Sequence, residues 1–277
     1  MSAIELTLLV AAGSFVAGLL GSLTGLGGGV VIVPLLTLAF HVDLRYAIGA
    51  SLVSVIATSS GAAAAYLREG YSNMRVGMFL EVATTVGALS GAYLATRAPA
   101  STIAIIFGAV LLYSAWTSIR QHSDKINPAP DELATKLRLD GDYPVDGARQ
   151  AYHVRRVPLG FGLMYVAGLL SGLLGIGSGA VKVLAMDQAM GIPFKVSTTT
   201  SNFMIGVTAA ASAGVYLRRG YIDPALAMPV MLGVLAGALL GARILPGAKV
   251  KTLRWVFSGV IAALAVQMIA KGAMHGF

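Results

Sequence analysis

The chain has 277 residues, of which 56% are hydrophobic and only 12% charged, and its formal net charge at pH 7 is +8. A soluble domain carries about 25% charged residues, so this composition predicts an integral membrane protein whose apolar surface is buried by lipid. The basic residues lie between apolar runs, where lipid headgroups are expected, and this excludes a nucleic-acid partner. The sequence has no cysteine, which excludes disulfides, thiolate metal sites and cysteine nucleophiles.

Ten apolar runs follow one another in two sets of five, after an N-terminus that lacks the features of a signal peptide. The runs are 4–23, 29–40, 44–66, 74–96 and 101–119, then 157–174, 179–190, 195–217, 224–243 and 252–270. Eight runs are long enough to span a bilayer, whereas 29–40 and 179–190 would each rise about 18 Å against a hydrocarbon core of roughly 30 Å. We therefore predict an all-α integral membrane protein, a two-fold repeated helical bundle with a short re-entrant or broken helix in each half.

Residues 120–156 between the two sets are rich in Pro, Gly and charge, and we predict a soluble loop. Within it, Leu133–Leu139 and Gln150–Val157 flank a turn-rich stretch at Asp140–Asp142 and can pair as a small hairpin. The basic residues of this short loop place it in the cytoplasm by the positive-inside rule. The predicted domains are a first membrane repeat at 1–119, the cytoplasmic loop at 120–156 and a second membrane repeat at 157–277.

The two sets repeat each other at a constant offset of about 150 residues without gaps. The matching pairs include Val16–Leu20 with Val166–Leu170, Tyr66–Tyr71 with Tyr216–Tyr221, and Gly87–Ala92 with Gly237–Ala242. Duplicated halves with interrupted helices at matching places are typical of transporters, whose site lies near the midplane between the repeats. The Lys and Arg distribution favours inverted halves but places Arg218 and Arg219 outside, so a parallel arrangement stays open.

Gly-rich breaks precede both short runs, at Gly25–Gly29 and Gly175–Gly179. Glycine lets the backbone leave helical geometry, and the half-helix that follows points free N–H groups and a positive dipole end at the break. The alternative is that small residues there permit tight helix packing. Because the break is repeated ahead of a short segment, we predict that both breaks converge on one polar, anion-binding cavity. The predicted binding residues from the breaks are Gly27, Gly28, Gly29, Gly177, Ser178 and Gly179.

Ionisable and hydroxyl groups inside apolar runs supply the remaining candidates. Lys182 lies one turn into the second short run, where a charge costs about 2.5–3.5 kcal/mol, and Asp187 would lie about 140° away around the helix. We therefore predict that Lys182 binds a substrate anion, although snorkelling to the interface is the alternative. Ser201 and Asn202 belong to a polar run that can donate to oxyanions or, as the alternative, hold helices together, and Ser51 matches Ser201 in the first half. Glu81 is a candidate for a coupling proton or for pairing with a neighbouring span.

The two breaks, together with Gly179–Val183 and Thr200–Thr208, resemble the sulfite exporter TauE/SafE family of membrane proteins. The resemblance covers nearly the whole chain outside 120–156, and it implies secondary, often proton-linked transport of small sulfur-containing anions such as sulfite, sulfoacetate and other sulfonates. Two positions depart from the family pattern. Ser178 stands where a third consecutive glycine is usual, and Leu184 stands where a proline often follows, as Pro34 does in the first half.

We therefore expect a multi-pass cell-membrane protein, in the inner membrane if the source is Gram-negative. It is expected to export small sulfur-containing anions and to bind them between the two breaks. A passive anion channel and a carrier for a non-sulfur carboxylate are the alternatives. We expect no enzymatic activity, no cofactor and no metal, because the histidines lie in loops or at the tail. The expected partners are a small anion, the lipid bilayer and protons, while the oligomeric state is left open. The histidines are His41, His122, His153 and His275.

Overall fold

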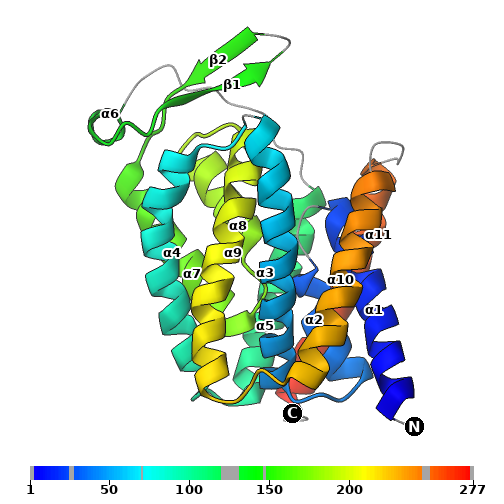
Figure 1. Ribbon diagram of the computed structural model, residues 1–277. Coiled ribbons are helices and arrows are strands. Elements are labelled where there is room, and N and C mark those ends of the chain that lie inside the picture. The colour runs from blue at the N-terminus through cyan, green and yellow to red at the C-terminus, as the bar shows by residue number, and fades with distance from the viewer. Residues whose placement is uncertain are drawn as a thin grey trace.

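The computed structural model describes residues 3–24, 28–69, 71–119, 131–145, 148–244 and 250–274 (Figure 1). The first half contains helices α1 Ala3–Thr24, α2 Gly29–Pro34, η1 Leu35–Ala39, α3 Leu44–Glu69, α4 Met74–Ala95 and α5 Ala100–Ile119. The middle contains α6 Glu132–Lys136 and the strands β1 Gly141–Val145 and β2 Ala148–Tyr152. The second half contains α7 Val157–Leu174, α8 Gly179–Leu184, η2 Ala185–Ala189, α9 Phe194–Arg218, α10 Pro224–Ile244 and α11 Val250–Ala273. Each predicted apolar run corresponds to a helix, which confirms the all-α membrane bundle.

Five helices of the described residues, α1, α4, α5, α7 and α10, are long and apolar enough to cross a membrane. The sequence predicted eight spanning runs, and α3 and α9, which carry many serines and threonines, are not among these five. These two helices pack against each other inside the bundle. Most of their serines and threonines are buried, so the bundle shields these hydroxyl groups from lipid.

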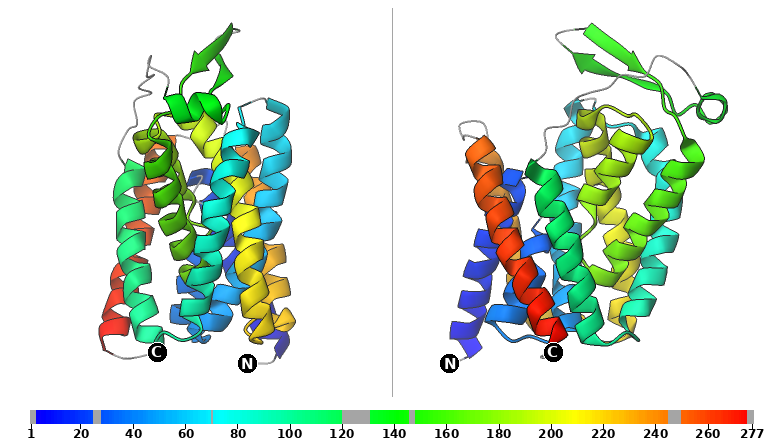
Figure 2. Two further views of the ribbon diagram at one scale, coloured as in Figure 1. Left: turned by 90° about the vertical axis from the view of Figure 1, so that its left-hand side faces the viewer. Right: turned by 180° about the vertical axis from the view of Figure 1, so that it is seen from behind.

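Helices that lie 150 residues apart in the sequence run in opposite directions. In Figures 1 and 2, α1, α3 and α5 run toward the end that carries the β-hairpin, whereas α7, α9 and α11 run away from it. Helices α4 and α10 likewise oppose each other. This is the inverted arrangement that the distribution of Lys and Arg favours.

The two halves interlock through glycine-lined helix pairs, because α7 packs on α4 and α1 packs on α10. A Cβ atom at Gly168 or Gly172 of α7 would collide with the backbone carbonyl of Thr84 or Ala88 of α4. A Cβ at Gly237 of α10 would collide in the same way with the backbone of α1. At these positions glycine is required for close approach of two helix backbones, as in other membrane bundles.

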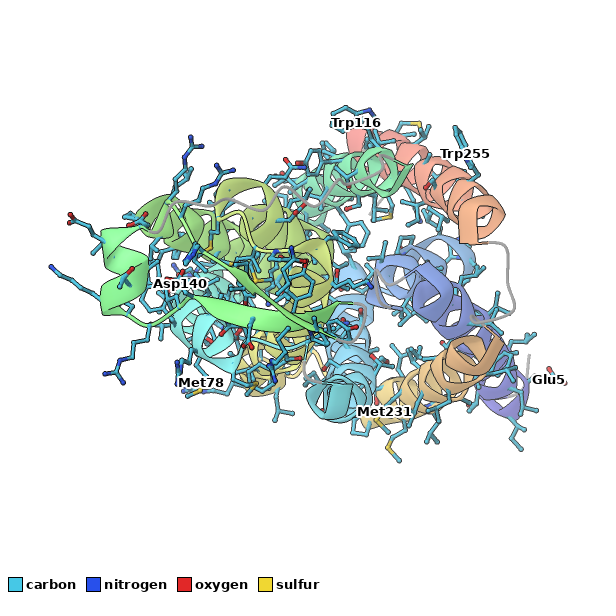
Figure 3. All side chains as sticks on the ribbon, turned by 90° about the horizontal axis from the view of Figure 1, so that it is seen from above. Glu5, Met78, Trp116, Asp140, Met231 and Trp255 are labelled. Carbon is cyan, nitrogen blue, oxygen red and sulfur yellow. The ribbon has the colours of Figure 1, made fainter. Side chains whose placement is uncertain are left out.

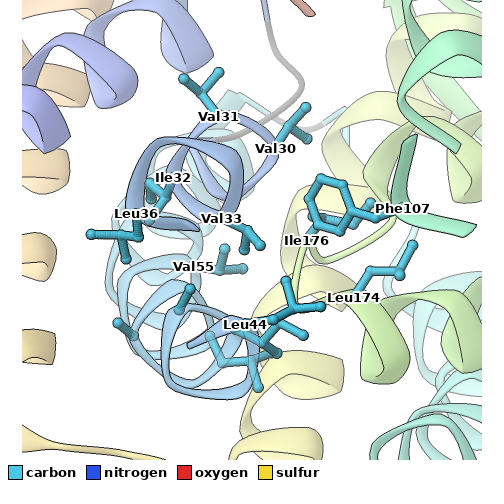
Figure 4. Packing of buried hydrophobic residues seen from close by; sticks show 14 of the residues in the cluster. Val30, Val31, Ile32, Val33, Leu36, Leu44, Val55, Phe107, Leu174 and Ile176 are labelled. Atoms are coloured by element: carbon cyan, nitrogen blue, oxygen red, sulfur yellow. The ribbon is translucent and has the colours of Figure 1, made fainter. Parts of the chain in front are cut away.

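The two short helices lie inside the bundle, and all six residues of α2 are buried (Figure 4). Each continues into a π-helical turn, η1 after Pro34 and η2 after Leu184. Pro34 removes a backbone donor and thereby disfavours regular α-helix, yet Leu184 is followed by the same turn without it. The tertiary packing therefore imposes the same shape on both short segments.

The central segment contains an antiparallel hairpin in which Gly141 pairs with Tyr152 and Val145 with Ala148. This hairpin has other bounds than the sequence predicted: the predicted turn Asp140–Asp142 leads into and forms part of β1, and the predicted strand Leu133–Leu139 contains α6. Asp131 begins α6, since its side chain accepts a hydrogen bond from the Leu133 N–H. This cap favours helix where the sequence suggested a strand.

Figure 3 shows that the hairpin covers one side of the bundle end and leaves α1, α10 and α11 uncovered. Trp116 of α5 and Trp255 of α11 point outward at the perimeter (Figure 3) and are more than half exposed. Exposed tryptophans near helix ends are typical of the membrane–water interface. They place the upper ends of α5 and α11 at the level of the lipid headgroups.

Candidate functional site

The two Gly-rich breaks lie next to each other in the bundle and are joined by one side chain. Ser51 Oγ on α3 donates a hydrogen bond of 2.8 Å to the carbonyl oxygen of Gly175 and lies 3.5 Å from that of Gly29. Ser201 Oγ on α9 lies 3.4 Å from the carbonyl oxygen of Gly179, which repeats the contact between Ser51 and Gly29 at the offset of 150 residues. The serines predicted to bind an anion therefore tie the central helices to the breaks.

The second break turns through left-handed backbone conformations. Gly175 and Gly177 have φ values of +68° and +74°, and Ser178 has φ +48°. Glycine adopts such values without cost, but a residue with a Cβ is strained there, and strained residues cluster at functional sites. Ser178 Oγ is buried and has no hydrogen-bond partner among the described residues. A ligand oxygen could accept this hydrogen bond.

The first break is only partly described, because Gly27 lies outside the described residues. Gly28 has ordinary right-handed helical angles, and a Cβ there would lie 2.8 Å from a methyl group of Val234 on α10. Gly28 therefore serves helix packing in this conformation. Gly29 faces the centre instead, because a Cβ at this position would lie 3.4 Å from the carbonyl oxygen of Gly175.

Apolar side chains occupy the space where the sequence predicted a polar cavity between the breaks. A Cβ at Gly177 would lie 2.8 Å from Ile205 and 3.3 Å from Val55, and these two residues are equivalent at the 150-residue offset. Gly179 packs against Ile205 and Gly29 against Val55. The breaks are thus in direct contact with hydrophobic side chains, and the structure is closed at this level.

The polar groups gather beside the second break, around Lys182 of α8. The lysine is fully buried, and its Nζ donates a hydrogen bond of 2.6 Å to Thr208 Oγ1 on α9. Thr208 Oγ1 lies 2.7 Å from Glu81 Oε1 on α4, which also accepts from Thr85 at 3.2 Å. Three helices therefore contribute to one chain of hydrogen bonds from an ammonium group to a carboxylate.

Lys182 and Glu81 also attract each other electrostatically. Two buried charges of opposite sign tolerate the low dielectric of the bundle only because each offsets the other. The second oxygen of the carboxylate, Glu81 Oε2, is buried and has no partner among the described residues. The pair is therefore incompletely satisfied, which is the state expected of a group that changes partners.

Sequence reasoning found Lys182 and Glu81 separately and missed that Thr208 joins them. A signal was present, because Thr208 follows Ser201 by seven residues and so lies on the same face of α9. The matching positions at the 150-residue offset are Ile32 and Thr58 in the first half and Met231 in the second half. The charged cluster therefore exists at one of the two places related by the repeat, although the backbone of both places is similar.

Asn202, the remaining predicted site residue, is half-buried on α9 next to Ser201. Its amide has no hydrogen-bond partner among the described residues, so it is available to a ligand or to water. Ser201 itself is fully buried. Ser201 and Asn202 therefore differ in solvent exposure, although both belong to the predicted polar run.

A pocket of about 280 Å³ lies between the hairpin and the turn that joins α3 to α4. Asn73 fastens its two sides: its Nδ2 donates to the Leu139 carbonyl at 3.0 Å and to Tyr152 Oη at 2.7 Å, and its Oδ1 accepts from the Val76 N–H. Burial raises the pKa of the Tyr152 phenol to about 12, so the phenol stays neutral at physiological pH. The pocket is lined by Tyr71, Ser72, Asn73, Met74, Arg75, Asp140, Gly141, Asp142, Arg149 and Tyr152.

Comparison with known families gives a match over residues 10–268 to the family described as sulfite exporter TauE/SafE. The chain belongs to this family. The match spans both halves and the central segment, so the short helices and the cluster around Lys182 lie within the family's fold. Its members are multi-pass membrane transport proteins, and the membrane bundle described above agrees with that class.

Relatives of this TauE/SafE chain carry transporter names. It is 29% identical over 265 residues to "Probable membrane transporter protein YunE" of Bacillus subtilis, a match that covers 93% of this chain and 95% of the relative. It is 28% identical to "Probable membrane transporter protein YdhB" of the same organism, over 83% and 86% of the two chains. It is 26% identical to "Probable membrane transporter protein MJ0441" of Methanocaldococcus jannaschii, over 95% of both. No solved structure matches the chain.

Proposed function

We propose that this membrane transporter is a secondary carrier that exports small sulfur-containing anions such as sulfite or organosulfonates. The observation that carries the proposal is a fully buried lysine, Lys182, in a short helix that begins at a glycine-rich break in the centre of the bundle. A buried cation beside such a break is a site for a negatively charged group. The family description supplies the sulfur-containing anion.

In this proposal the anion binds between the breaks, against Lys182. Ser178 contributes its free hydroxyl, Asn202 contributes its amide, and Ser51 and Ser201 exchange their carbonyl partners for the ligand. The N–H groups of Gly177 and Gly179, with those of the first break, complete the anion site. Because Val55 and Ile205 fill the space beside Gly177 in this structure, binding requires the two halves to separate, as in alternating access.

Glu81 is the proposed carrier of a coupling proton, since it is the ionisable group that approaches Lys182 through Thr208. A carboxyl group that loses and regains a proton as its partner changes is how many carriers couple proton and substrate movement. The hairpin end of the bundle is proposed to face the cytoplasm, because the basic residues of the central segment favour that side.

The proposal is tested by anion flux in proteoliposomes that contain the purified chain. Replacing Lys182 by Met removes the charge-assisted contact, which is worth about 1.5–3 kcal/mol, so sulfite or sulfonate flux at low substrate concentration should fall about 10–150-fold. Lys271→Met is the matched control, because Lys271 donates to the Thr37 carbonyl on η1 and lies outside the site. The control should retain flux.

The same preparation separates the alternatives. A carrier gives saturable flux whose net direction reverses when the imposed gradient is reversed, whereas a channel does not saturate in this way. Parallel measurements with acetate distinguish a carboxylate carrier from a sulfonate carrier. Undiminished flux in Lys182→Met would show that the anion binds elsewhere.

A further inference from the structure

We propose that Glu81 is a tethered competitor for the transported anion: its carboxylate holds Lys182 through Thr208 in the empty carrier, and the anion that displaces it carries a single negative charge. This inference rests on the proposed function, because it concerns the same site. Beyond the proposed function, it specifies the charge of the substrate and explains why the carrier can close without substrate.

The geometry shows that Lys182 is already neutralised from within the protein. Its Nζ is 2.6 Å from Thr208 Oγ1, and the same oxygen is 2.7 Å from Glu81 Oε1. A buried ammonium group without a counter-charge would cost several kcal/mol in the middle of a bundle. The carboxylate therefore allows the two halves to close with no substrate present. An arriving anion must then take its place.

Thr208 can serve both states without a backbone movement. Its hydroxyl has one proton and two acceptors within reach, Glu81 Oε1 at 2.7 Å and the Met204 carbonyl at 2.8 Å. While the carboxylate is in place, the hydroxyl accepts from Lys182 and donates to Glu81. When the carboxylate withdraws, the proton turns to the Met204 carbonyl, and the hydroxyl oxygen still accepts from Lys182.

Few charged groups of the described residues lie around this cluster, and they set the charge of the ligand. Helix α7, which packs on α4, has no charged residue within its bounds. On η2, Asp187 lies beyond the next turn and has an interaction of its own, while Arg75 on α4 and Lys195 on α9 lie near the hairpin end. Lys182 is thus the cation that faces Glu81. Once the displaced Glu81 has taken up the coupling proton, a monoanion balances one lysine, whereas a dianion would bury an excess negative charge.

The positions that match the cluster through the repeat support the same charge balance. Ile32 and Thr58 in the first half match Lys182 and Thr208, and Met231 in the second half matches Glu81. Thr58 donates to carbonyls of its own helix. The repeat therefore supplies no second cation to match a second ligand charge. The preferred head group is a singly charged sulfonate, hydrogensulfite or carboxylate.

The test uses the purified full-length chain in nanodiscs and measures the Kd for methanesulfonate and for sulfate by calorimetry at one neutral pH. Glu81→Gln keeps the size of the side chain and removes its charge, so the Kd for methanesulfonate should fall at least about tenfold. Glu81→Met, which introduces the residue of the equivalent position, should shift the Kd in the same direction. Thr58→Val is the matched control for removal of a membrane hydroxyl, and its Kd should equal that of the unaltered chain.

The outcomes distinguish this inference from the proposed function. If Lys182→Met weakens methanesulfonate binding but neither Glu81 variant tightens it, the competitor role is wrong while the anion site stands. If sulfate binds as tightly as methanesulfonate, the single-charge preference is wrong. If neither the unaltered chain nor either Glu81 variant binds any of these anions, the proposed function fails together with the inference. Thermal unfolding of each variant shows that it is folded before its Kd is interpreted.

Discussion

Replacing Asn73 by Ala should release the hairpin from the membrane bundle while leaving the bundle folded. The Asn73 side chain uses both Nδ2 protons, on the Leu139 carbonyl and on Tyr152 Oη, and its Oδ1 caps α4 at the Val76 N–H. The hydrogen bond from the Asn73 backbone N–H to Thr200 Oγ1 on α9 does not involve the side chain. The substitution therefore removes three hydrogen bonds at a single junction.

The magnitude follows from those three bonds. Loss of a helix N-cap costs about 1 kcal/mol, and each of the two side-chain hydrogen bonds contributes about 1 kcal/mol. Part of the cap energy falls on α4 alone, so the hairpin should lose about 2–3 kcal/mol of its docking free energy. At 1.4 kcal/mol for each factor of ten, this increases the population of the undocked hairpin by about 30–150-fold.

The measurement is amide hydrogen exchange of the purified chain in nanodiscs, followed by mass spectrometry of peptides from the hairpin. Asp223→Ala is the matched control, because Asp223 lies 150 residues after Asn73 and its side chain accepts from the Ala225 N–H at the start of α10. This control loses a comparable cap at the end of the bundle that carries no hairpin. Hairpin exchange should therefore accelerate in Asn73→Ala and stay unchanged in Asp223→Ala.

Equal hairpin protection in Asn73→Ala and in the unaltered chain would refute this reasoning. It would mean that the apolar contacts of the hairpin, such as those of Tyr143, Tyr152 and Val154 with α4 and η2, hold it without the polar junction. Accelerated exchange in both variants would instead show that loss of a cap loosens the whole bundle. Either result would show that the Asn73 side chain is not what holds the hairpin on the bundle.

Two further predictions concern glycine positions. Ser178→Gly relieves a left-handed φ of +48° and should stabilise the protein by up to about 1 kcal/mol, which a higher melting temperature would show. Loss of the hydroxyl should raise the Kd for methanesulfonate. A lower melting temperature would contradict the strain argument. Gly172→Leu should abolish recovery of folded, monodisperse protein, because a side chain there collides with the Ala88 carbonyl on α4. Gly162→Leu on the same helix has open space around it and should be recovered normally, so equal recovery of both would show that α4 and α7 can separate.

The positions of the helices were available from the sequence, because in a membrane protein hydrophobicity and length suffice to locate them. Each predicted run agrees with a helix to within a few residues, and the short runs 29–40 and 179–190 are the short helices α2 with η1 and α8 with η2. Backbone groups in lipid must bond within their own segment. The local sequence therefore largely decides where a helix begins and ends.

The hairpin shows where local patterns fail outside the membrane. The sequence indicated two strands around a turn at Asp140–Asp142, but the Asp131 cap forms α6, and β1 begins at Gly141. The Asp140 carboxylate accepts from the Val154 N–H. This hydrogen bond holds the two ends of the hairpin together, and it depends on the tertiary structure and not on the local sequence pattern.

The sequence by itself determined that Lys182 and Glu81 are unusual, since an ionisable residue within an apolar run is costly wherever it lies. Only the tertiary structure decided that they meet, because they lie on different helices and the link between them is the Thr208 hydroxyl of a third helix. The same holds for the breaks, which the sequence located and the structure packed against Val55 and Ile205. Hydrophobic periodicity carries information along one helix, whereas partners across helices depend on how the backbones cross.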